Sequence, residues 1–157
     1  MADLGVLCES LEKRFGAKTR IKDNVCYVEV GVGRYLEVAE ELRKEFDRLL
    51  TVSAVDFIKQ GLFEVYFVLY DFETNVYCKV STKIPRDRAE VDSLSNLWPN
   101  ASMHEREVWE MFGIKFRGNP MLRPLLTEEW RGPPPFRKDF DWRKYVAETY
   151  KIPQALR

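Results

Sequence analysis

The middle of the chain carries three runs of β-branched and aromatic residues, and these runs restrict the possible folds more than any other feature of the sequence. They cover residues 51–58, 62–70 and 76–84, and such runs predict β-strands. The connection over residues 59–61 is short and ends in a glycine, which predicts that the first two strands form an antiparallel hairpin. Pro85 follows the third run and is expected to end that strand.

Helical and strand spacing alternate before these runs. Apolar residues recur every three or four positions over residues 4–15, and Gly16 follows, so we expect a helix that ends at this glycine. Residues 25–32 are rich in β-branched side chains and predict a strand. Helical spacing returns at Tyr35 and continues to Leu49, with charged residues on the opposite face, which predicts an amphipathic helix.

Another helix is expected after the third strand of the hairpin region. Ser102 and Glu105 have the spacing of a capping box, which predicts a helix over residues 103–112 that stops at Gly113. The element order is then α-β-α-β-β-β-α. This order predicts an α+β fold, in which a small mixed or antiparallel sheet carries helices on one face.

The chain changes character after this helix. Prolines and glycines are too frequent over residues 117–136 for regular structure. We therefore expect a core domain over residues 1–113, followed by an extended proline-rich C-terminal arm over residues 114–157. A short helix is expected near residues 142–150. An irregular segment of this length is typically either functional or stabilised by a partner.

The composition argues against several classes of function. Lys+Arg and Asp+Glu number 25 each, so no net positive charge favours nucleic acid or an anionic membrane. Cys8, Cys26 and Cys78 form no C-x-x-C pair, so we expect buried thiols rather than disulfides, zinc or iron–sulfur ligands. The N-terminus has no signal-peptide pattern, and the apolar run over residues 62–70 is too short to span a bilayer. We expect a protein of the cytoplasm that reaches a membrane only through partners.

Two isolated motifs are weak candidates for chemistry. Gly31 and Gly33 follow a strand and precede a helix, as in a dinucleotide-binding loop, but Leu36 stands where the third glycine belongs. His104 is the only histidine, and no Cys or Ser motif accompanies it. We therefore predict no catalytic residue, no cofactor-binding residue and no metal ligand in this chain.

Residues 105–107 read Glu-Arg-Glu and place three charges in the first turn of the expected helix. Arg106 and Glu110 are spaced to pair on one face, while Trp109 and Phe112 lie on another with the first carboxylate. One interpretation is a solvated, well-capped helix. The other is that arginine and aromatic side chains at this density anchor an interface. Catalytic carboxylates of the glycosidase kind are the weakest option, because no substrate cleft is indicated.

The arm interleaves basic residues with aromatic ones, which is also typical of single-stranded nucleic-acid sites. The basic residues are Arg123, Arg137 and Lys138, and the aromatic residues are Phe116, Trp130, Phe136, Phe140 and Trp142. Acidic residues occur throughout the same stretch, so no sustained positive groove results. We interpret the arm as a partner-binding strip with polar and apolar contacts.

An ordered series of short elements over residues 85–140 is highly specific. The series comprises Glu105-Arg106-Glu107, Glu110, Met111-Phe112-Gly113-Ile114, Phe116, Gly118, Pro120, Arg123, Leu125-Leu126, Trp130, Gly132, Pro135 and Arg137-Lys138-Asp139-Phe140. In these elements the chain resembles the 30-kDa-type subunit of respiratory complex I, the respiratory NADH dehydrogenase. It resembles equally the homologous subunit of membrane-bound, energy-converting hydrogenases.

Several positions depart from the family's usual residues. They are Asn119, Pro124 and Asp141, together with an extra proline between Gly132 and Arg137. These departures indicate a hydrogenase-like or archaeal relative rather than a standard bacterial or mitochondrial complex I protein.

The resemblance implies a non-catalytic, cofactor-free scaffold subunit in the hydrophilic part of a membrane-bound electron-transfer complex, on the cytoplasmic side of the cell membrane. Its implied partners are a large quinone-site or nickel–iron (NiFe) hydrogenase-type subunit and iron–sulfur subunits, which carry the clusters. The residues expected at the subunit interface are Glu105, Arg106, Glu107, Trp109, Phe112, Arg123, Trp130, Arg137, Lys138, Asp139 and Phe140. The alternatives are a stand-alone binding module, an assembly factor for such a complex, or a self-contained enzyme.

Overall fold

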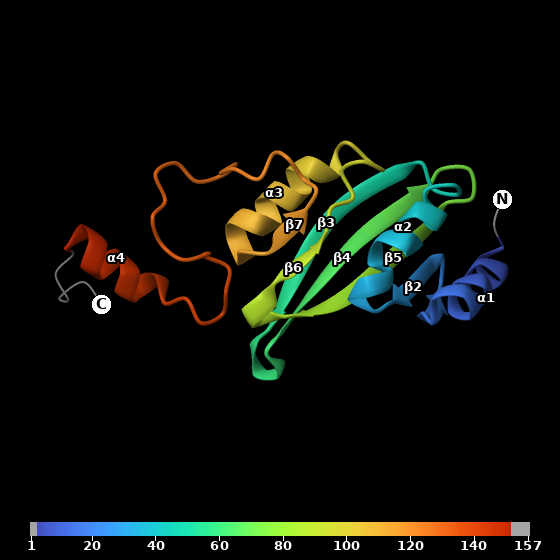
Figure 1. The fold of residues 1–157 in the computed structure, drawn as a ribbon, viewed down its shortest axis with the longest axis horizontal. Coiled ribbons are helices and arrows are strands. Elements are labelled where there is room, and N and C mark those ends of the chain that lie inside the picture. The colour runs from blue at the N-terminus through green and yellow to red at the C-terminus, as the bar shows by residue number, and fades with distance from the viewer. Residues whose placement is uncertain (1–2, 152–157) are drawn as a thin grey trace.

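The computed structural model describes residues 3–151, which form a sheet covered by helices and an arm that extends away from it (Figure 1). The helices are α1 (Leu4–Phe15), α2 (Tyr35–Leu42), α3 (Ala101–Phe112) and α4 (Trp142–Tyr150). The strands are β1 (Lys18–Lys22), β2 (Val25–Glu29), β3 (Arg48–Phe57), β4 (Leu62–Asp71), β5 (Val76–Pro85), β6 (Glu90–Asp92) and β7 (Lys115–Arg117). The predicted α+β class is confirmed.

Five of the strands form one mixed sheet in the order β1-β2-β5-β4-β3. β1 pairs antiparallel with β2, β3 with β4, and β4 with β5, while β2 and β5 run parallel. The predicted hairpin between β3 and β4 is present. Gly61 closes it with a φ of 67°, a left-handed conformation that glycine adopts without a Cβ clash.

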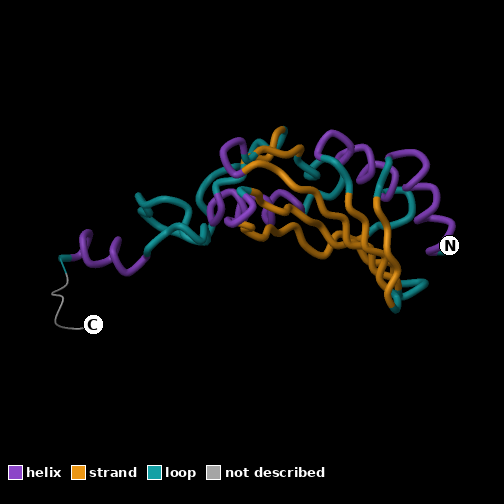
Figure 2. The backbone as a smooth tube through the Cα atoms, turned by 90° about the horizontal axis from the view of Figure 1, so that it is seen from below, coloured by secondary structure: helices purple, strands orange, loops and turns teal. Residues whose placement is uncertain are grey.

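The hydrophobic core lies between this sheet and the helices on one of its faces (Figure 2). Every second residue of β4 from Phe63 to Leu69 is buried, as the period of a strand requires. Tyr35 of α2 packs edge-on against Phe67, with ring centroids 5.4 Å apart. Burial of one large apolar side chain stabilises a fold by about 1.5–3 kcal/mol, so this layer contributes most of the stability.

The strand β1 is not predicted by the sequence pattern. Its residues are mostly charged or polar and exposed, so no apolar alternation marks it. A turn at Asp23, with a φ of 55°, connects it to β2. β1 forms an edge of the sheet, where charged side chains such as Lys18 and Lys22 oppose edge-to-edge association.

The helix predicted from Tyr35 to Leu49 is too long. α2 ends at Leu42, and β3 begins at Arg48. Phe46 and Leu49 are both buried, but Phe46 lies in the connecting turn and Leu49 lies in β3. Apolar spacing does not distinguish a continued helix from a turn that leads the chain back to the same core.

The predicted capping box at the start of α3 is wrong. The helix begins at Ala101, and its N-cap residue Asn100 forms no side-chain cap hydrogen bond. Ser102 instead donates to Oδ1 of Asn119 at 3.3 Å, and Glu105 is buried inside the core. The spacing is present, but tertiary contacts occupy both side chains.

The hydrophobic core continues past the predicted boundary at residue 113. Ile114 and Phe116 are buried in it, and β7 pairs in parallel with β6. From here on, the arm means residues 118–151. Its short helix is present as α4, with Asp141 as N-cap accepting hydrogen bonds from the backbone N of residues 143 and 144. α4 has no buried residue and lies at the far end of the arm, away from the sheet (Figures 1 and 2).

Candidate partner interface

Most of the interface residues predicted from the sequence lie in the arm or in α3, which the arm contacts. The arm leaves β7 as an irregular loop, shown in orange, and returns towards the end of α3 before it reaches α4 (Figure 1). Several sets of contacts hold this loop to the core.

Glu110 of α3 holds the first part of the loop. Its carboxylate accepts hydrogen bonds from the backbone N of Leu125, Leu126 and Thr127 at 3.0, 2.8 and 2.9 Å, and from the Thr127 hydroxyl. Burial acts to raise the pKa of Glu110, but these hydrogen bonds outweigh it, and the pKa lies below its ordinary value. The loop has no helix or strand to pair these three consecutive backbone N–H groups, so the charged carboxylate of Glu110 satisfies them instead.

Arg106 binds the same loop through its backbone carbonyls. Nε donates to the carbonyl of Arg123 at 3.2 Å, and Nη2 donates to that of Pro124 at 2.9 Å. The predicted pair between Arg106 and Glu110 is therefore wrong, because each side chain binds loop backbone instead.

Arg137 closes the C-terminal end of α3. Its Nε donates to the carbonyl of Phe112 at 2.7 Å, and the backbone N of Phe136 donates to the carbonyl of Met111 at 2.9 Å. The last carbonyls of a helix lack partners within the helix, and a cation is favoured beside them. Gly113 is the C-cap of α3, with its N–H bonded to the carbonyl of Trp109, and the arm satisfies two further carbonyls at this end of the helix.

An ion-pair network joins the arm to the sheet. Nε of Arg86 lies 2.9 Å from Oδ1 of Asp56, a carboxylate that is 2% exposed. Nη2 of Arg86 donates to Oδ1 of Asp139 at 2.7 Å, and the backbone N of Lys138 donates to Asp56 at 2.9 Å. The hydrogen bond from Arg86 holds the pKa of Asp139 below its ordinary value, and it raises the pKa of Arg86.

Glu105 lies in the core and reaches no surface. It is 0% exposed and accepts hydrogen bonds from Ser93 Oγ at 2.6 Å, Leu94 N at 2.7 Å and Asn119 Nδ2 at 2.8 Å. Burial raises the pKa of Glu105, although these hydrogen bonds act in the opposite direction. Its contacts are internal: it links α3 to the segment after β6 and to the start of the arm.

Trp130 and Phe140, both predicted interface anchors, form an aromatic cluster within the arm. Their ring centroids are 5.8 Å apart, and the ring of Tyr145 in α4 lies 4.7 Å from Trp130 and 5.7 Å from Phe140. Gly132 allows this packing, because a Cβ there would lie 2.8 Å from Trp130 and 2.9 Å from Tyr145. The cluster connects α4 to the loop.

The arm exposes large apolar side chains that were not in the predicted interface set. They are Met121, Leu126, Phe136, Trp142 and Tyr150, each between 40% and 69% exposed. We take these exposed apolar groups as candidate contacts for a partner. Irregular backbone has no period, so no sequence signal separates its inward side chains from its outward ones.

The remaining predicted residues divide between surface and core. Glu107, Arg123 and Lys138 are exposed, whereas Trp109 and Phe112 are half-buried and packed against the core. The prediction also missed Asp56 and Arg86, and it left Glu110 outside the interface set. The available signal for Asp56 was a lone carboxylate on the inward face of an apolar strand, where an unpaired charge is costly.

All three cysteines are buried free thiols, as predicted. Burial raises the pKa of Cys8 to about 12, so it is a thiol and not a thiolate at neutral pH. Within residues 3–151, no group of three or more His, Cys, Asp or Glu side chains is placed to hold a metal ion. Of the helices described, none has both the length and the apolar character to cross a membrane.

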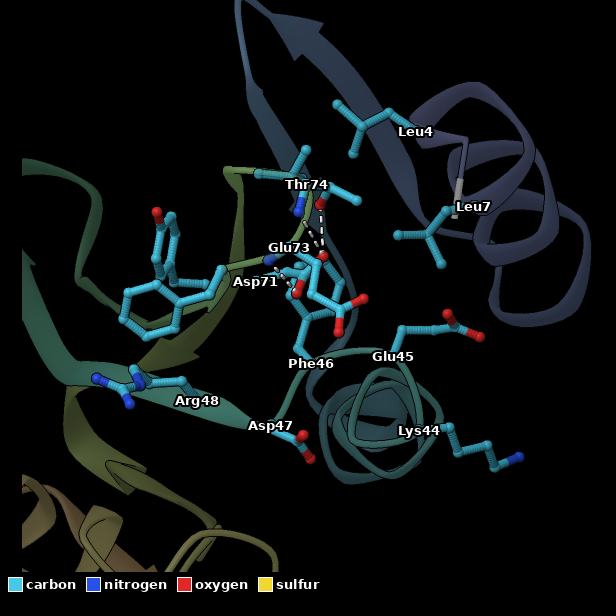
Figure 3. Close-up of a pocket in the computed structure, with 13 residues that line it drawn as sticks. Leu4, Leu7, Lys44, Glu45, Phe46, Asp47, Arg48, Asp71, Glu73 and Thr74 are labelled. Atoms are coloured by element: carbon cyan, nitrogen blue, oxygen red, sulfur yellow. Dashed lines mark hydrogen bonds between the residues drawn. The ribbon is translucent and has the colours of Figure 1, made fainter. Parts of the chain in front are cut away.

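A cleft of about 460 Å³ lies between α1, the turn after α2 and the β4–β5 connection (Figure 3). Its carboxylate Asp71 accepts hydrogen bonds from the backbone N of Glu73 at 3.2 Å and from the Thr74 hydroxyl at 2.5 Å. Asp71 therefore stabilises its own turn.

Comparison with known proteins gives the same family for most of the chain. Residues 28–146 match the family model described as "Respiratory-chain NADH dehydrogenase, 30 Kd subunit". An NADH-quinone oxidoreductase subunit of Novosphingobium aromaticivorans is 39% identical over 109 residues, which are 68% of this chain and 34% of that protein. An F(420)H(2) dehydrogenase subunit of Methanosarcina mazei is 34% identical over 108 residues, which are 67% of this chain and 68% of that protein.

Solved structures agree with these matches. A chain of the membrane-bound sulfane sulfur reductase, an archaeal respiratory membrane complex, has a TM-score of 0.84 and 29% identity, with 94% of this chain and 91% of that chain covered. The trypsin-resistant fragment of Nqo5 shares the fold, with a TM-score of 0.65 and 21% identity over 74% of this chain and 97% of the fragment. The chain therefore belongs to the family of the 30-kDa subunit of respiratory-chain NADH dehydrogenase, whose relatives are subunits of membrane respiratory complexes.

Proposed function

We propose that this protein is a non-catalytic scaffold subunit, and that its arm binds along a neighbouring subunit of a membrane-bound electron-transfer complex. One observation carries the proposal: the arm is fixed to the core by Glu110, Arg137 and Arg86, yet it presents its large apolar side chains outward. The arm is already held in place, and its outer side chains are exposed to solvent. Such a segment loses less conformational entropy on binding a partner than a disordered segment does.

The neighbour we propose is the large subunit, of the quinone-site or NiFe type, with iron–sulfur subunits nearby. The names of the relatives support membership of a redox complex in which such a neighbour could occur, because they are an oxidoreductase subunit, a dehydrogenase subunit and a chain of a reductase complex. In this proposal the metal centres reside in the partner subunits and this chain holds none. Its membrane association is peripheral, through those partners, on the cytoplasmic side.

The test is affinity purification of tagged full-length protein from gently solubilised native membranes, with the bound subunits identified by mass and assayed for iron and nickel. We expect a large subunit and iron–sulfur subunits in equal stoichiometry with the tagged chain. Recovery of a metal-free monomer would contradict the proposal. Substoichiometric recovery with incomplete complexes only would instead support an assembly factor.

Matched substitutions locate the interface. Leu126→Ala and Trp142→Ala remove exposed side chains of the arm, and Phe72→Ala removes an equally exposed ring from the β4–β5 connection. Interface aromatic anchors contribute about 2 kcal/mol or more to binding, so we expect Trp142→Ala to weaken co-purification at least tenfold. Phe72→Ala should leave co-purification unchanged. If Trp142→Ala and Phe72→Ala co-purify with the partner subunits equally well, the arm is not the interface.

A further inference from the structure

We propose that the open face of the five-stranded sheet, opposite the helices, is a second docking surface, and that its occupant is an acidic segment of another subunit of the complex. This surface lies on the sheet and not on the arm. The proposal rests on the chain being part of a multi-subunit complex, and it is independent of what the arm binds.

The strand register places a defined set of side chains on this face. Tyr27 of β2 stands between Arg20 of β1 and Lys79 of β5, because both are its partners in the ladder. In the adjacent row, Ser81 of β5 is the partner of Tyr66 in β4. The strand neighbours of Tyr27, Lys79, Ser81 and Tyr66 are buried on the core side, so the alternation assigns these four residues to the open face. Arg20 of β1 has no buried neighbours, and it is assigned to the same face by its pairing with Tyr27.

The charge of this face differs from that of the whole molecule. By the same alternation its cationic residues are Lys18, Arg20, Lys22, Arg48, Lys79 and Lys83, and its carboxylates are Glu29 and Glu64. The chain as a whole carries 25 basic and 25 acidic residues. The excess of cations is therefore local to the face, and it complements an acidic partner.

Three of these cations, Arg20, Arg48 and Lys79, rest on aromatic rings instead of pairing with carboxylates, and the ring under Arg48 is that of Phe72. Nζ of Lys79 lies 4.2 Å from the ring centroid of Tyr66, and the guanidinium carbon of Arg20 lies 4.8 Å from that of Tyr27. Among the ion pairs found in residues 3–151, the one that joins two side chains of this face is Lys83–Glu29 at 3.5 Å. Lys79 and Arg20 are thus positioned by the rings while their charges stay available to a partner.

The shape and chemistry of the face favour one class of partner. The charged row borders a shallow hollow of about 300 Å³, and its lining includes the cations Lys18, Arg20 and Lys79 and the carboxylates Glu29 and Glu64. Cations cover the rings of Tyr27 and Tyr66, so these rings are less able to stack on nucleic-acid bases. A second copy of the chain would bring like charges together in a symmetric contact. An acidic protein segment satisfies the cations without either conflict.

The experiment compares lysine acetylation in the isolated full-length chain and in the intact complex, with each site quantified by mass spectrometry. We expect Lys79 to react at least about tenfold more slowly in the complex, because a seated acidic segment shields its amine. Lys13 and Lys44, on the helix-covered side, serve as reference sites with 79% and 68% side-chain exposure. Equal reactivity of Lys79 in both samples would overturn the proposal.

A zero-length carbodiimide, which joins an amine to a carboxylate that it contacts, then identifies the occupant in the same complex. Products between Lys18, Lys79 or Lys83 and an Asp or Glu of another subunit are the expected result. Two results would refute an acidic segment of another subunit as the occupant. One is cross-linking between two isotopically distinguished copies of this chain, and the other is protection of Lys79 that nuclease treatment abolishes. Protection of the arm is measured in the same sample, so failure at the sheet face is distinguished from failure of the arm interface.

Discussion

At the scale of single residues, α3 shows how surroundings decide the behaviour of identical side chains. Glu105 and Glu110 are both buried carboxylates on this helix, but burial dominates at Glu105 and hydrogen bonds dominate at Glu110. Glu105 faces three neutral donors, whereas Glu110 accepts four hydrogen bonds from the arm. Their pKa values consequently shift in opposite directions.

The first prediction concerns the pH dependence of stability through Glu105. Because burial raises the pKa of Glu105, the folded protein keeps this proton at pH values at which the unfolded chain has lost it. The stabilisation due to Glu105 is fully present below the unfolded-state pKa, about 4.3, and is lost as the pH rises through the folded-state pKa. The difference in free energy of unfolding between the wild type and Glu105→Gln should therefore fall as the pH rises from acidic to neutral.

Urea denaturation of both proteins at a series of pH values measures this difference. Glu107→Gln changes an exposed carboxylate on the same helix and serves as the control. A difference that grows towards neutral pH would show that hydrogen bonds, not burial, dominate at Glu105.

The second prediction concerns Gly113, where α3 ends and the arm returns. Its φ is 74°, and a Cβ would lie 2.9 Å from Cγ of Pro134 and 3.1 Å from Nη2 of Arg137. Gly113→Ala should lower the free energy of unfolding by about 1–3 kcal/mol, since it combines a left-handed non-glycine residue with a clash against the arm. Gly16→Ala is the matched control, with a φ of 64° and nothing within 4 Å of its Cβ position. If both variants lose the same free energy of unfolding, the arm does not pack closely against Gly113.

At the scale of elements, the sequence predicts those whose pattern is set locally. The runs of β3, β4 and β5 and the helix α1 were predicted because alternation or three- and four-residue spacing persists over many residues. β1 was missed because it lies at an edge and buries little, and α2 was overextended because Phe46 and Leu49 keep helical spacing in a turn and a strand.

The candidate interface was predictable only in part, because its contacts join residues far apart in the chain. Asp56 and Arg86 bind a segment more than 50 residues further on, through Lys138 and Asp139. Spacing rules concern neighbours in sequence, so they assigned Arg106 and Glu110 to each other when both bind the arm. These long-range partners are visible only in the three-dimensional structure.

The third prediction follows from the network between Asp56 of β3, Arg86 just after β5, and the arm. Arg86→Met leaves Asp56 as a buried carboxylate without its cation, so the free energy of unfolding should fall by about 3–5 kcal/mol. Asp139→Asn removes a partner whose side chain is 54% exposed, and the expected loss is about 0–1 kcal/mol. Chemical denaturation of the two variants measures both losses of free energy of unfolding. Similar losses would refute the claim that Arg86 matters more to stability than Asp139.

At the scale of the whole molecule, the scaffold role that we propose rests on a folded core and an arm held in position by it. The core buries its apolar residues between sheet and helices, while the arm reaches away from it and ends in α4 (Figure 2). Within the described residues, the Trp130 cluster ties α4 to the loop by aromatic contacts, and Trp142 and Tyr150 are exposed. We therefore expect another subunit to cover the outer side of the arm.

Amide hydrogen exchange, compared between the isolated full-length chain and the native complex, tests this requirement most directly. In the isolated chain we expect slow exchange at Leu125, Leu126 and Thr127, whose N–H groups bind Glu110, and fast exchange in α4. In the complex, exchange in α4 should slow at least about tenfold, because a covering subunit suppresses local opening. Unchanged exchange in α4 between the two samples would contradict the claim that the arm is a partner-binding strip.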